Sequence, residues 1–65
     1  MPVVNVEMYK GRPVEKKRQL AKAITDAFVT ILGLKPEVVT IIFNETEKEN
    51  WAIGGELQSD KTPVK

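Results

Sequence analysis

The segment from Val38 to Phe43, with the sequence VVTIIF, limits the possible folds of this chain more than any other feature. Its branched residues and nearly continuous apolar character are typical of a β-strand that is covered on both faces. The chain has only 65 residues and no cysteine, and a domain of this size buries only about 60% of the surface that its unfolded form exposes. We therefore expect residues 1–65 to form one small domain that depends on self-association, since one helix cannot cover both faces of the strand.

A first strand is predicted from Val3 to Tyr9. Along this segment Val4, Val6 and Met8 alternate with residues that point to the opposite side. An alternation with a period of two indicates a strand with one covered face.

A helix is predicted to begin near Pro13 or Val14 and to stop at Gly33, because proline suits the first turn of a helix and glycine a left-handed stop. One apolar stripe is expected on this helix, with members spaced three and four residues apart: Leu20, Ala23, Ile24, Ala27, Phe28, Ile31 and Leu32. The other faces are expected to carry Lys16, Lys17, Arg18, Lys22, Thr25 and Asp26. The basic run at 16–18 is compatible with a solvated helix face or with a polyanion site, and the near-neutral total charge favours the solvated face.

This order of elements predicts an α/β (α+β) fold. A helix of roughly 18 to 20 residues between two strands forms a βαβ unit, whose right-handed crossover makes the strands parallel. Two strands do not form a stable sheet alone. We therefore expect a dimer with a continuous four-stranded sheet and two helices on one side, and further association through the uncovered face.

The C-terminal third is predicted to be mostly irregular. Pro36 and Glu37 favour a short turn before the second strand, and residues 44–50 are polar and are expected to form a loop. The pair Gly54-Gly55 predicts a tight turn or a small hairpin. Residues 58–65 carry little pattern and are expected to fray unless a neighbour holds them.

Composition excludes several classes of function. The 10 Lys and Arg against 9 Asp and Glu give a net charge of +1, far from the basic footprint of a nucleic-acid-binding protein. No apolar run approaches the roughly 20 residues that span a bilayer, and no signal segment is present, so we expect a cytoplasmic protein without a membrane partner. The chain has no histidine and no cysteine, and no phosphate loop or dinucleotide fingerprint. We expect neither a metal nor a cofactor.

The few residues suited to chemistry begin with Pro2. Removal of Met1 would expose a proline nitrogen, which is a secondary amine and a potential base, and an apolar site beside a cation lowers the pKa of such an ammonium group. Arg12 is suited to supply this cation and also to bind a carboxylate through its planar guanidinium group. Trp51 and Ile53 are candidates for the apolar lining that excludes water from the site. These residues also have simpler interpretations: Pro2 is a proline at this position by chance, Arg12 is a surface charge, and Trp51 fills an oligomer interface.

Taken together, these features resemble the 4-oxalocrotonate tautomerase family over nearly the whole chain. The resemblance rests on Met1-Pro2 opening a strand, Gly11-Arg12 just after it, a single long helix, a covered second strand, and the segment WAIGGEL at 51–57. It implies a tautomerase of aromatic degradation with Pro2 as general base, which moves a proton between the oxygen and carbon ends of an enol. It further implies that Arg12 binds the substrate carboxylate from an adjacent subunit, that Trp51 keeps the base in an apolar environment, and that the protein is a homohexamer built from dimers.

One position departs from the family pattern. Where well-known members carry a second arginine in the second strand, this chain has Thr40, which donates only a neutral hydrogen bond, roughly half as strong as a charge-assisted one. We therefore expect a divergent subgroup whose small 2-hydroxy-enoic or 2-oxo acid substrate differs from the simple dicarboxylate, or which binds the dicarboxylate poorly. Two alternatives stay open: a hydratase or dehalogenase of unsaturated acids on the same fold, and a non-catalytic oligomeric interaction module.

Overall fold

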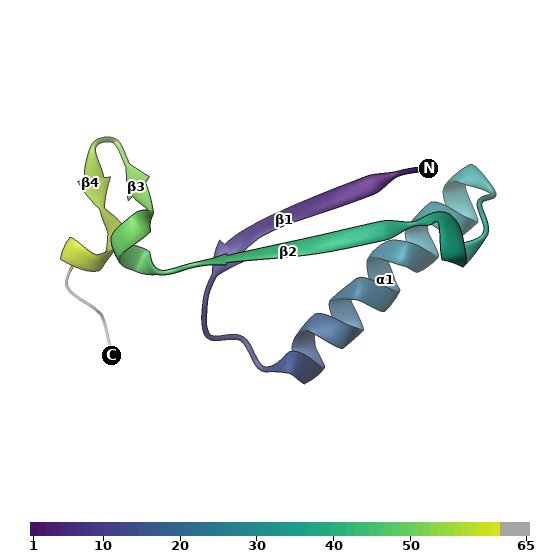
Figure 1. Cartoon of the computed structure of the whole chain (residues 1–65), viewed down its shortest axis with the longest axis horizontal. Helices are drawn as coiled ribbons and strands as arrows, with labels where there is room; N and C mark the ends of the chain where they lie inside the picture. The colour runs from purple at the N-terminus through teal and green to yellow at the C-terminus, as the bar shows by residue number, and fades with distance from the viewer. Residues whose placement is uncertain (62–65) are drawn as a thin grey trace.

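The computed structural model describes residues 1–61 of the chain. Strand β1 (Val3–Tyr9) is followed by helix α1 (Val14–Leu32), strand β2 (Thr40–Thr46) and a hairpin of strands β3 (Ala52–Ile53) and β4 (Glu56–Leu57). Short 3-10 helices occupy Pro36–Val38, Lys48–Asn50 and Gln58–Asp60. Figure 1 shows β1 and β2 side by side, α1 lying obliquely beside them, and the hairpin at the end of the molecule opposite the N-terminus. This is the α+β fold that the sequence predicts.

The central βαβ unit is confirmed. Strands β1 and β2 pair in parallel, from Val3 opposite Thr40 to Tyr9 opposite Thr46. Helix α1 begins after Pro13, and Gly33 ends it in the left-handed conformation with φ 70°. The predicted helix boundaries are therefore correct, because proline and glycine act locally on the backbone.

The predicted bounds of the second strand are wrong by a few residues. The predicted turn at Pro36 is a 3-10 helix in which the Val39 N–H donates to the Pro36 carbonyl, so β2 begins only at Thr40. At its other end, β2 continues to Thr46, into a segment that the sequence predicts as loop. The polar residues there extend as a strand because they pair with the end of β1.

The face of α1 that packs on the sheet also differs from the prediction. Ile24 and Phe28 are half-buried as expected, but Leu20, Ile31 and Leu32 are 39%, 77% and 59% exposed. The half-buried positions of the helix are Lys17, Ala21, Ile24, Thr25, Phe28 and Val29. Lys17 and Thr25 thus lie on the covered face rather than a polar one; for Lys17 the reason is an ion pair with Glu45 of β2 at 2.9 Å.

The hairpin is confirmed at Gly54-Gly55, where both glycines have positive φ, 62° and 84°. This conformation is typical of a two-residue turn between antiparallel strands. After it, residues 58–60 form a 3-10 helix, and the Gln58 N–H donates to the Trp51 carbonyl at 2.7 Å. Residues 58–60 are thus held by a neighbouring segment, which is the exception that the expectation of fraying allows. Residues 62–65 lie outside the described part of the chain.

A single chain has no enclosed core: none of the residues 1–61 is fully buried. The Cα radius of gyration is 15.2 Å, against about 11 Å for a compact chain of this length. The accessible surface is 5116 Å², against about 4,200 Å² for a folded monomer of this mass. Much apolar surface is left that a stable fold would need to cover. Within residues 1–61, no helix combines the length and apolar character needed to cross a membrane.

Candidate active site

Pro2 and Thr40 lie together at one end of the parallel sheet. The Thr40 N–H donates to the Pro2 carbonyl at 3.0 Å, which continues the pairing of β1 with β2 by one residue. Pro2 is half-buried, and Thr40 is exposed. The position of the Pro2 ring is therefore fixed by the sheet rather than by a free chain end.

Arg12 lies at the other end of β1. It follows Tyr9, the last residue of the strand, and precedes α1; Gly11, with φ 120°, provides the backbone conformation for the change of direction between them. A strand of this length measures about 23 Å. One chain therefore does not bring Pro2 and Arg12 together, and any site that uses both must combine two chains.

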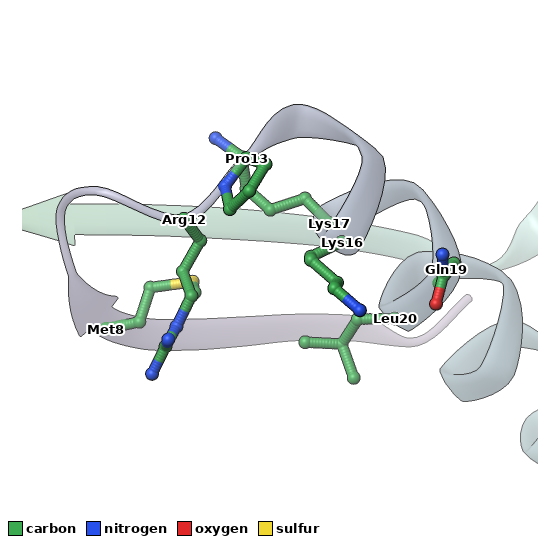
Figure 2. Close-up of a pocket in the computed structure, with 7 residues that line it drawn as sticks. All are labelled: Met8, Arg12, Pro13, Lys16, Lys17, Gln19 and Leu20. Carbon is green, nitrogen blue, oxygen red and sulfur yellow. The ribbon is translucent and has the colours of Figure 1, made fainter.

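Two hollows flank Arg12. The larger, about 560 Å³, lies between the end of β1 and the first turns of α1 and is lined by Met8, Arg12, Pro13, Lys16, Lys17, Gln19 and Leu20. Figure 2 shows Arg12 and Lys16 extending in the same direction, with Met8 beside Arg12 and Leu20 beside Lys16. The smaller hollow, about 210 Å³, is lined by Tyr9, Lys10, Gly11, Arg12 and Lys48. Arg12 thus has access to an anion from either side.

Two aromatic residues, Tyr9 and Trp51, lie at the same end of the molecule as Arg12. The rings of Tyr9 and Trp51 meet edge to face, with centroids 4.5 Å apart, and the Lys48 Nζ lies 5.3 Å from the centroid of the Tyr9 ring. Ile53 is in β3, opposite Glu56, and is 57% exposed. Trp51 and Ile53 therefore belong to the Arg12 end of the chain, far from Pro2 of the same chain.

The charges at this end are unequally neutralised. Lys10 pairs with Glu47 at 3.1 Å, and Lys17 pairs with Glu45. Within residues 1–61, Arg12 and Lys48 have no ion pair. Lys16, which lines the larger hollow with Arg12, also has no ion pair within these residues. Arg12, Lys16 and Lys48 are therefore free to bind an anion, and the nearby carboxylates of Glu45 and Glu47 are already engaged.

A model of the protein family described as "Tautomerase enzyme" matches residues 2–61. The chain belongs to this tautomerase family. The match spans every described element from Pro2 onward, and it makes the protein an enzyme of the tautomerase type, which is an isomerase.

Related proteins agree with this tautomerase assignment over nearly their full length. "Probable tautomerase K2" of Dickeya dadantii is 39% identical over 62 residues, 94% of this chain and 92% of the relative. A crystal structure of a 4-oxalocrotonate tautomerase homologue is 41% identical, with a TM-score of 0.89, covering 97% of this chain and 100% of that one. A heterohexamer 4-oxalocrotonate tautomerase from Chloroflexus aurantiacus is 27% identical, with a TM-score of 0.84, covering 92% of this chain and 97% of that one.

Sequence reasoning did not single out Tyr9 or Lys48 as site residues of this tautomerase. Tyr9 is the last residue of an ordinary strand pattern, and Lys48 is one basic residue in a polar segment. Their proximity to Arg12 arises only because the segment after β2, which contains Lys48 and Trp51, lies beside the end of β1. No local signal in the sequence marks this contact.

Proposed function

We propose that this protein is a cofactor-independent tautomerase that interconverts the enol and keto forms of a small 2-hydroxy-enoic or 2-oxo acid. The general base is the nitrogen of Pro2 after removal of Met1, and the carboxylate anchor is Arg12. The observation that carries the proposal is the half-buried position of Pro2 at the end of the sheet where β1 and β2 begin, in a chain whose residues 2–61 match the tautomerase family.

The reaction needs one base that both takes and returns a proton. The Pro2 nitrogen removes the proton of the enol hydroxyl, the oxygen becomes a carbonyl, and the electron pair of the carbon–carbon double bond takes the same proton back at carbon. Arg12 holds the carboxylate with its planar fork, and this fixes the distance between the base and the reacting carbon. Trp51 and Ile53 exclude water from the base, which keeps the nitrogen neutral.

The site is completed by self-association. Pro2 and Arg12 lie at opposite ends of β1, so Arg12 and Trp51 of one subunit approach Pro2 of another. The absence of a fully buried residue among residues 1–61 supports an obligate oligomer. The heterohexamer in the Chloroflexus aurantiacus enzyme supports a homohexamer built from dimers here, with each chain a single domain over residues 1–65. We place this assembly in the cytoplasm.

Removal of the base tests the proposal. The processed protein and its Pro2→Ala variant are compared in the ketonisation of phenylenolpyruvate and of 2-hydroxymuconate. Loss of a general base is expected to lower kcat by about 10²- to 10⁴-fold. Intact mass spectrometry checks that Met1 is absent from both proteins, and circular dichroism checks that both are folded. Equal rates for the two processed proteins would remove Pro2 from the mechanism.

A further inference from the structure

The hollow between Tyr9, Arg12 and Lys48 has the features of an anion-binding site with two cations. Its volume is about 210 Å³, many times the roughly 10–15 Å³ that one water molecule needs on the same kind of measure. The space is large enough for a small organic acid. Of the basic side chains that line it, Arg12 and Lys48 lack an ion pair within the described residues, whereas Lys10 is engaged by Glu47 at 3.1 Å.

The ammonium group of Lys48 is positioned by a contact with the Tyr9 ring. Its Nζ lies 5.3 Å from the centroid of the Tyr9 ring, a cation–π contact that orients the ammonium group without neutralising it. The Tyr9 ring is itself fixed by its edge-to-face contact with Trp51. The Lys48 ammonium is therefore positioned over a fixed ring and keeps its capacity to donate to an oxygen anion.

Because position 40 is a threonine, the charge of Lys48 becomes relevant to substrate binding. A threonine at this position supplies no charge, so a substrate with two anionic groups meets only Arg12 among the site residues that the sequence singles out. Lys48 lines the same hollow as Arg12, on a different element, the 3-10 helix Lys48–Asn50. Two cations from separate segments can hold two separated carboxylates at once.

We propose that Lys48 is a specificity-determining residue that binds the second carboxylate of a dicarboxylate ligand while Arg12 binds the first. The inference rests on the proposed function only in taking this ligand to be the substrate. A ligand with a single carboxylate forms an ion pair with Arg12 alone. The site therefore prefers dicarboxylates to monocarboxylates of the same length, and Lys48 is the cause of the preference. This conclusion departs from the expectation drawn from Thr40 alone, which did not take Lys48 into account.

A matched pair of unreactive acids tests this proposal. Muconate and sorbate share one carbon skeleton and one pair of double bonds, and they differ only in the second carboxylate. Their Kd values are measured by calorimetry at fixed ionic strength on the full-length protein and on Lys48→Gln, Lys48→Arg and Lys10→Gln variants. Lys10→Gln is the control, because Lys10 lines the same hollow but is already paired with Glu47.

The wild-type protein is expected to bind muconate about tenfold more tightly than sorbate, which corresponds to about 1.4 kcal/mol. Lys48→Gln is expected to bring this ratio close to one by weakening muconate binding alone, and Lys48→Arg is expected to restore it. Lys10→Gln is expected to leave the ratio unchanged within twofold. Lys48 is exposed, so Lys48→Gln should keep the wild-type thermal unfolding midpoint.

Several outcomes would overturn the proposal. The first is a wild-type protein that binds muconate no more tightly than sorbate. The second is a Lys48→Gln variant whose ratio of the two Kd values is unchanged, or which loses the same affinity for both acids. The third is a Lys10→Gln variant that changes the ratio as much as Lys48→Gln does. Binding of these acids needs no proton transfer, so the result is independent of Pro2. A Pro2→Ala variant with full activity would remove the base assignment and leave the dicarboxylate site intact.

Discussion

The ring of Trp51 meets the ring of Tyr9 edge to face, with 4.5 Å between their centroids and 62° between their planes. This contact joins the segment that leads into the hairpin to the last residue of β1. Close to it, the Gln58 N–H donates to the Trp51 carbonyl, so the 3-10 helix after the hairpin is attached to the same residue. Trp51 therefore organises the end of the molecule that carries Arg12 and Lys48.

The Tyr9–Trp51 contact should contribute measurable coupling energy. Aromatic pairs of this geometry are worth about 0.5–1.5 kcal/mol beyond the area that they bury. A double-mutant cycle with Tyr9→Leu and Trp51→Leu, followed by urea unfolding at one protein concentration, is expected to give a coupling energy of about 1 kcal/mol. A coupling energy near zero would mean that the two rings act independently on stability.

The ion pair between Lys17 and Glu45 should stabilise the protein more than an exposed pair on the same helix. Its nitrogen–oxygen distance is 2.9 Å, and the two side chains are 23% and 26% exposed, so partial burial strengthens the attraction and leaves any unpaired charge poorly solvated. Lys17→Met is expected to lower the free energy of unfolding by about 1–2 kcal/mol.

The pair between Lys22 and Asp26 is the matched control, because its side chains are 78% and 61% exposed at a similar distance of 3.0 Å. Lys22→Met is expected to cost about 0.5 kcal/mol or less. Chemical denaturation in low and high salt compares the two variants. The hypothesis fails if both substitutions have the same effect on the free energy of unfolding.

The parts of the fold that local signals determine could be predicted from the sequence. Pro13 and Gly33 set the ends of α1, and Gly54-Gly55 sets the turn of the hairpin, because each acts on its own backbone. The bounds of β2 could not be predicted in this way. Residues 44–46 are polar, and they become strand only because β1 offers them pairing partners.

The candidate site was predictable only in part. Pro2 and Arg12 are recognisable because they flank the first strand, and the predicted strand, whose bounds Val3–Tyr9 are correct, already separates them. Tyr9 and Lys48 have no local signal, since the contact between them depends on where the segment after β2 turns. The assignment of Lys17 to a polar face was wrong because its charge partner is 28 residues away in the sequence.

The face of the sheet opposite α1 should be an interface. Glu45 contacts the helix through Lys17, so Ile42, at the opposite parity of the strand, faces away from α1, and it is 43% exposed in the single chain. Ile42→Lys places a charge on this apolar position and is expected to convert the oligomer into smaller or unfolded species. Sedimentation velocity measures the change.

Thr30→Lys is the control for this prediction, because Thr30 is exposed on α1 and a charge there is compatible with solvent. It is expected to sediment as the wild-type protein does. If the wild-type protein sediments as a monomer at micromolar concentration, the interpretation of the uncovered sheet face is wrong, together with the requirement for two chains at the site.

Thr40 offers a gain-of-function prediction. Thr40 is exposed at the end of the sheet where β2 begins, and its N–H donates to the Pro2 carbonyl. A longer side chain at this position therefore fits without displacing another residue. An arginine at this position adds a cation near the proposed base, where it stabilises the negative charge that develops on the substrate oxygen. Thr40→Arg is expected to raise kcat for the ketonisation of 2-hydroxymuconate by about tenfold, a conservative share of the 10²- to 10³-fold effect of one such donor.

Thr40→Gln has a comparable reach without the charge and is the matched variant for Thr40→Arg. Because the expected gain comes from the cation, the glutamine variant should stay within about threefold of wild type, as a neutral donor is roughly half as strong as a charged one. Steady-state kinetics separate the two effects: charge stabilisation of the enolate raises kcat, whereas tighter substrate binding alone lowers KM. An equal gain from glutamine, or a change confined to KM, would show that position 40 acts through binding rather than through the developing charge.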